Sequence, residues 1–124
     1  MNSLLWTLQI VLAAIFGGAG AVKLIQLREQ LAKTVGGWVN DVPAQLIKLL
    51  GVAEVLAAIG LIVPPLVDIA PILTPIAATG LVLTMIGAIV THARRREFLN
   101  VAVNVVLAIM AVVVAWGRFG PYAF

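Results

Sequence analysis

Four stretches of this chain are long, apolar and almost free of charge, and they constrain its fold more than any other feature. Each has about the 20 residues that a helix needs to cross a hydrocarbon core of about 30 Å. The strands of a membrane barrel alternate polar and apolar residues, whereas these stretches do not. The pattern therefore predicts four membrane-spanning helices, over residues 4–24, 44–63, 72–92 and 101–118.

The composition supports the same class of protein. Of the 124 residues, 63% are hydrophobic and only 10% are charged, whereas an ordinary soluble domain is about 45–50% apolar. A soluble fold of this size could not hide so much apolar surface, because a domain of about 150 residues buries only about 70% of what its unfolded chain exposes. We expect an all-α membrane protein in which residues 1–124 form one four-helix transmembrane bundle, with no separate aqueous catalytic domain.

The basic residues at the ends of these stretches indicate the orientation of the chain. They gather in the polar connection 26–43 and after the third stretch, where Arg94, Arg95 and Arg96 are consecutive. By the positive-inside rule these ends are cytoplasmic, so both termini lie outside. The three arginines are interpreted as a topology signal that also contacts anionic lipids. The first stretch lacks the basic start of a signal peptide and is expected to remain as a span. We expect a multi-pass protein of the bacterial inner membrane.

Several classes of chemistry are excluded by residue counts. The chain has no cysteine and one histidine, so it cannot form a CxxC redox relay, a thiolate metal site or an internal bis-histidine haem site, and no metal site is expected. Nucleic-acid binding is not expected either, because the net charge is only +3 and the basic residues lie where topology signals are found.

Four polar side chains within the predicted spans are the main candidates for function. Each predicted helix carries one of them toward its cytoplasmic half: Lys23, Glu54, His92 and Asn104. A charge at the centre of a membrane helix costs about 2.5–3.5 kcal/mol on translocon scales, so such groups face the bundle interior and find a partner. We predict that Lys23 and Glu54 lie within salt-bridge reach and that His92 and Asn104 line the same cavity, as candidates for ligand binding or proton relay.

Structural interpretations of these polar residues stay open. In one interpretation Lys23 and Glu54 form an ion pair that only stabilises the fold. In another, the Lys23 side chain extends to the membrane interface. His92 is then an interfacial residue at a helix end, and Asn104 joins two helices through its amide. The three tryptophans are interpreted as anchors at the membrane interface: Trp6, Trp38 and Trp116.

Two local predictions concern helix boundaries. A short interfacial helix is expected over residues 24–35, before the Gly36-Gly37 break. The second span is expected to stop at Pro64-Pro65, because proline lacks the N–H that continues a helix.

Four segments of the chain resemble those of a known family. They are GGAGAVKL in the first span, GVAEVLAAIGLIVP in the second, ILTPIAATGLVLTMIGAIVTHARR in the third and NVVLAIMAVVVAWGRF in the fourth. Together they resemble the DoxX-like family of small four-span membrane proteins, with Lys23, Glu54, His92 and Asn104 at the matching positions. The resemblance implies no single reaction, because members of the wider group include the small subunit of a membrane thiosulfate:quinone oxidoreductase and proteins that assist receptor assembly. Fold-level likeness is a weak guide to function.

The leading hypothesis is a small accessory subunit whose polar cluster contacts a quinone or another lipophilic ligand for an oxidoreductase partner. Quinone chemistry couples electrons to protons, which Glu54 and His92 could carry, while the electrons come from elsewhere. On this hypothesis the isolated chain is not a complete enzyme and carries no covalently bound cofactor. The alternatives are a membrane-protein assembly factor and a small proton-coupled transporter, which would require a homo-oligomer.

Overall fold

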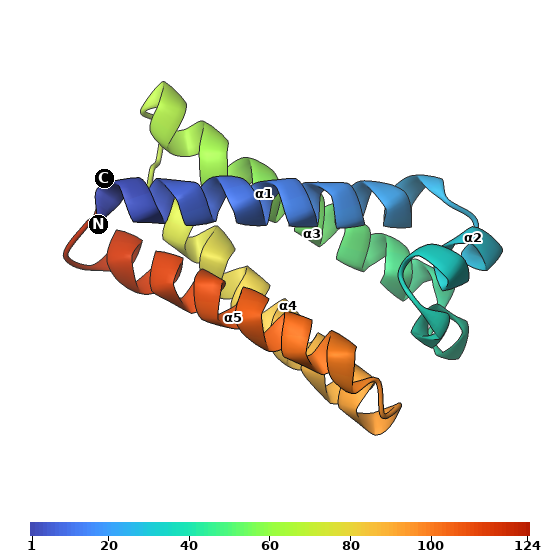
Figure 1. Ribbon diagram of the computed structural model, residues 1–124. Helices are drawn as coiled ribbons and strands as arrows, with labels where there is room; N and C mark the ends of the chain where they lie inside the picture. Colours follow the sequence, from blue (N-terminus) through green and yellow to red (C-terminus); the bar gives the residue numbers. More distant parts are fainter.

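The computed structural model describes residues 1–124, and every regular element in it is helical (Figure 1). The elements are α1 (Asn2–Ile25), α2 (Arg28–Thr34), the 3-10 helix η1 (Gly37–Asp41), α3 (Ala44–Val67), α4 (Leu73–Arg94) and α5 (Phe98–Phe119). Four of them, α1, α3, α4 and α5, are long and apolar enough to cross a membrane. The predicted all-α, four-span architecture is therefore confirmed, and the chain is a multi-pass membrane protein.

The four long helices form two pairs. α1 packs along α3, and α4 packs along α5, whereas the contacts between the two pairs are fewer. The backbones of α1 and α3 touch where two glycines face each other: a Cβ atom on Gly20 would lie 2.7 Å from the carbonyl oxygen of Gly51, and one on Gly51 would lie 2.9 Å from that of Gly20. This close approach brings the side chains of neighbouring residues on the two helices together.

The two ends of the bundle differ. The termini end holds both chain termini and the turn 68–72, and the loop end holds residues 26–43 and 95–97 (Figure 1). At the termini end the helix pairs are joined by hydrogen bonds from Arg118 Nε to Gln9 Oε1 (2.8 Å) and from Arg118 Nη1 to Asn2 Oδ1 (2.7 Å). The hydroxyl of Thr74 donates to the carbonyl of Gly60 (2.9 Å) and joins α4 to α3 at the same end. The two pairs are thus tightly connected at the termini end.

The prediction that the second span stops at Pro64-Pro65 is wrong, because α3 continues through both prolines to Val67. Each proline removes the N–H that would bond the carbonyl four residues earlier, which leaves the oxygens of Gly60 and Leu61 free. Thr74 donates to the first of these oxygens, and Gln9 Nε2 donates to the second (2.6 Å). Side chains of two other helices therefore replace the missing backbone bonds and allow the helix to continue.

The polar connection contains the short helix that the sequence predicts before Gly36-Gly37, although it begins later than expected. α1 runs to Ile25, a break follows, and α2 spans Arg28–Thr34 before α2 and η1 fold back toward α3. A small apolar cluster of Leu31, Val39 and Ile47 holds this segment against α3. The connection is therefore a packed part of the protein, and it forms one wall of the site described next.

Candidate ligand-binding cavity

A cavity of about 480 Å³ lies at the loop end of the bundle, between the two helix pairs. Twelve of its 19 lining residues are hydrophobic, and its volume is within the range of about 300–1,000 Å³ that small-molecule sites occupy. Its walls come from all four spans and from residues 35–42. All four polar residues singled out from the sequence line it: Lys23, Glu54, His92 and Asn104. The structure thus brings these four side chains to one cavity, as the sequence predicts.

Lys23 and Glu54 form an ion pair across α1 and α3. The distance from Lys23 Nζ to Glu54 Oε1 is 2.8 Å, and the side chains are 9% and 4% exposed. The close approach of the two helices permits this pair, because Lys23 packs directly on Gly51: a Cβ atom there would lie 3.0 Å from the Cβ atom of Lys23. From this position the long lysine side chain reaches Glu54, about one turn further along α3. Its charges cancel, so this wall of the cavity presents a dipole and carries no net charge.

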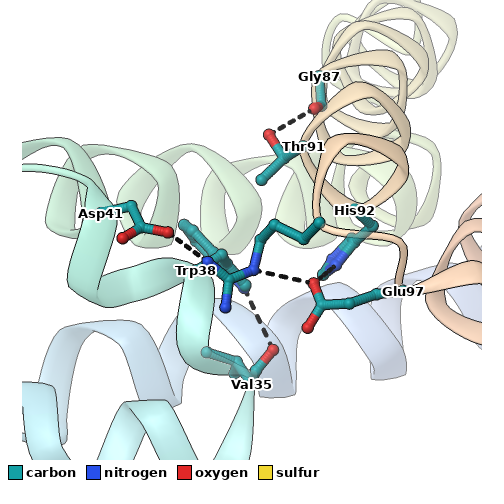
Figure 2. Close-up of polar contacts among 8 residues, drawn as sticks. Val35, Trp38, Asp41, Gly87, Thr91, His92 and Glu97 are labelled. Atoms are coloured by element: carbon teal, nitrogen blue, oxygen red, sulfur yellow. Dashed lines mark hydrogen bonds and ion pairs between the residues drawn. The ribbon is translucent and has the colours of Figure 1, made fainter.

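His92, near the end of α4, is held by Glu97 in the turn before α5. The distance from His92 Nδ1 to Glu97 Oε1 is 2.8 Å (Figure 2). This hydrogen bond, helped by Arg95, lowers the pKa of Glu97, so Glu97 is an ionised acceptor at neutral pH and Nδ1 of His92 is the donor. The second ring nitrogen, Nε2, is not engaged by the protein and belongs to a residue that lines the cavity. In the neutral ring that nitrogen accepts a hydrogen bond.

Asn104 completes the polar part of the cavity from α5. It is 9% exposed and makes no side-chain hydrogen bond to another residue. The interpretation of Asn104 as an amide that joins two helices is therefore wrong. Its amide has both a donor and an acceptor available to an occupant of the cavity.

The loop end contributes residues that sequence reasoning did not assign to the site. Trp38, expected as an interfacial anchor, lines the cavity and donates from Nε1 to the carbonyl of Val35 (3.2 Å). Arg95, expected only as a topology signal, forms ion pairs with Asp41 of η1 and with Glu97 (Figure 2). Arg94 and Arg96 make no ion pair and are exposed. A carboxylate five residues after His92 is a sequence signal that could have identified Glu97.

A second polar group, centred on Arg118, lies at the termini end and does not line the cavity. Arg118, near the end of α5, is only 2% exposed. Besides Gln9 and Asn2 it bonds the carbonyl of Tyr122 (2.9 Å), and its Cζ atom lies 4.0 Å from the centre of the Phe124 ring. The sequence contains a signal for the burial of this group. Arg118 lies on the same helical face as Asn104, and Gln9 lies on the same face as Lys23.

The arrangement suits an amphiphilic molecule with a neutral polar group. The polar side chains of the cavity offer hydrogen-bond donors and acceptors but no unpaired charge, and the remaining lining is mostly apolar. A few placed polar groups in an apolar pocket are typical of small-molecule sites. The geometry therefore favours a hydrogen-bonding head on a hydrophobic body.

Comparison with known proteins agrees with this architecture. No curated protein and no solved structure matches the chain. The sequence profile of the DoxX-like family matches residues 7–114, a region that contains all four spans in whole or large part and all four cavity residues predicted from the sequence. Because that match covers most of its length, the chain belongs to the DoxX-like family.

Proposed function

We propose that this protein is an accessory subunit of a membrane redox system, in the bacterial inner membrane, and that its cavity binds a quinone or a closely similar lipophilic molecule. The observation that carries the proposal is the cavity itself: an apolar chamber between helix pairs whose polar residues include Asn104 and His92, both with unused hydrogen-bonding capacity. A quinone ring has two carbonyl oxygens that accept hydrogen bonds, and its isoprenoid or alkyl chain suits the apolar lining.

In this proposal the residues of the chain bind the ring and exchange protons with it. Asn104 would donate to one carbonyl, and His92, held by Glu97, would exchange a proton at Nε2. Reduction of a quinone to a quinol requires two electrons and two protons. The electrons come from an oxidoreductase partner, and the chain supplies a binding and protonation site for the ring.

Trp38 gives a direct assay of binding, because quinones quench indole fluorescence at short range. In a Trp6→Phe/Trp116→Phe background, Trp38 is the only tryptophan, and it lines the cavity. Decylubiquinone added to this protein in nanodiscs should quench the fluorescence saturably. The proposal fails if quenching rises linearly with the quinone in the bilayer, as collisional quenching does.

Two glycines provide a matched pair of variants for that assay. Gly87 lines the cavity, and a Cβ atom there would meet nothing within 4 Å, so Gly87→Leu should fill the cavity without a clash. Gly18 is exposed, is equally open and is not part of the lining. We expect Gly87→Leu to weaken saturable quenching at least about tenfold, the equivalent of 1.4 kcal/mol, and Gly18→Leu to leave it unchanged. Equal effects of the two substitutions would contradict binding in this cavity.

A further inference from the structure

We infer that the ion pair between Arg95 and Asp41 is a latch that controls access from water to the cavity at the loop end. The inference concerns regulation of the site for which a function is proposed above, and it rests on that function only for the identity of the molecule admitted. The pair joins the turn after α4 to η1, which belong to opposite helix pairs (Figure 2).

Few polar bonds join the two helix pairs, and they lie at two places along the bundle. These bonds cross from α1, α3 and their connection to α4, α5 and the tail. Those made by Arg118 and Thr74 are at the termini end, beside the close packing of Leu5 on Gly117. At the loop end, where the cavity lies, the only such bond is that of Arg95 with Asp41. Several polar bonds therefore join the pairs at the termini end, and a single polar bond joins them at the loop end.

Arg95 packs against the segment that contains η1. A Cβ atom on Gly37 would lie 2.8 Å from Arg95 Nη2, so the guanidinium lies against the backbone of the segment that contains η1. Val35, Trp38 and Val42, which surround this contact in the sequence, line the cavity. Release of Arg95 would detach this wall from the α4–α5 turn.

The strength of the pair suits a contact that opens readily. Its side chains are 33% and 64% exposed, and exposed ion pairs contribute little to stability because water screens them. Arg95 is also connected to the cavity, because Glu97 Oε1 accepts from Arg95 Nε (3.2 Å) and from His92 Nδ1 (2.8 Å). A molecule that engages His92 therefore acts on the carboxylate that positions the latch.

The latch can be tested without knowledge of the natural ligand, because the chain has no cysteine. Ala88 lines the cavity from α4, so Ala88→Cys places a single thiol inside it. The measured quantity is the rate at which a negatively charged, membrane-impermeant methanethiosulfonate modifies this thiol in nanodiscs. In this background we compare Arg95→Gln, Asp41→Asn and the control Arg94→Gln, which removes the same charge from the adjacent, unpaired residue.

We expect Arg95→Gln and Asp41→Asn each to raise the modification rate by about two- to fivefold, the range that corresponds to an exposed pair, and Arg94→Gln not to raise it. The two active variants change the local charge in opposite directions, so attraction of the reagent cannot explain a shared increase. Wild-type rates in both would overturn the latch, and if one variant does not fold, the other decides. Faster modification together with no saturable quenching by decylubiquinone would support the latch and contradict the proposed ligand.

Discussion

At the scale of single residues, the Lys23–Glu54 pair shows how a membrane helix can hold two charges. Both side chains are almost completely buried, and each is the other's only ion-pair partner. Burying an unpaired charge is far more costly than burying a hydrogen-bonded pair, because the loss of hydration is then uncompensated. The two residues therefore depend on each other for stability.

This dependence predicts the result of a double-mutant cycle. Glu54→Gln alone leaves Lys23 charged without a partner, so we expect it to lower the free energy of unfolding in detergent by about 3–5 kcal/mol. Adding Lys23→Met removes the stranded charge and should recover part of that loss. If the pair also shapes the ligand site, the double variant will fold but bind decylubiquinone more weakly. Unchanged stability in Glu54→Gln would mean that the carboxylate is not buried with Lys23 in the membrane.

The sequence identifies the four intramembrane polar residues of the cavity, but it does not identify the loop residues that surround them. A lysine, a glutamate, a histidine and an asparagine inside apolar spans signal a shared interior because each is costly in lipid. Trp38 and Arg95 carry no such signal, since a tryptophan and an arginine beside a span are expected at the interface. Their roles depend on how residues 36–42 fold back over the cavity, and this long-range contact has no local pattern in the sequence.

At the scale of the elements, α3 shows why a local rule for helix ends fails here. Pro64 and Pro65 would end an isolated helix, because they leave the carbonyls of Gly60 and Leu61 without donors. In the protein those donors are the side chains of Thr74 and Gln9. Within a bilayer no water is present to hydrogen-bond an unpaired carbonyl. These two side-chain bonds therefore help α3 to extend to Val67.

The Thr74 hydroxyl should therefore stabilise the protein only because Pro64 lacks the N–H that would otherwise bond the carbonyl of Gly60. We expect Thr74→Val to lower the free energy of unfolding by about 1–3 kcal/mol, the cost of a buried polar group left unpaired. In a Pro64→Ala background the backbone N–H can bond Gly60, so the same substitution should cost clearly less. Thermal unfolding in detergent of the four proteins measures this coupling. Equal losses in the two backgrounds would show that Thr74 contributes through packing and not through this carbonyl.

At the scale of the whole molecule, two helix pairs meet closely at the termini end and enclose a cavity at the loop end (Figure 1). The number of spans and the pairing of the first two could be predicted from hydrophobic length and from the short connection between them. A cavity shared by the four polar residues could also be predicted, but its size and its full lining could not, because they arise from the unequal closeness of the pairs along their length. That inequality is set by contacts such as Leu5 on Gly117 and Arg118 with Gln9, which are far apart in the sequence.

Co-purification tests most directly whether this cavity holds a quinone-like lipid in the native membrane, as we propose. The wild-type protein, Gly87→Leu and Gly18→Leu are isolated from the same native membranes, and the lipids bound to each are extracted and quantified by mass spectrometry. We expect quinone to be enriched over bulk phospholipid in the wild-type and Gly18→Leu proteins and to fall to the background ratio in Gly87→Leu. Quinone at the background ratio in all three proteins, or enriched equally in all three, would contradict the claim.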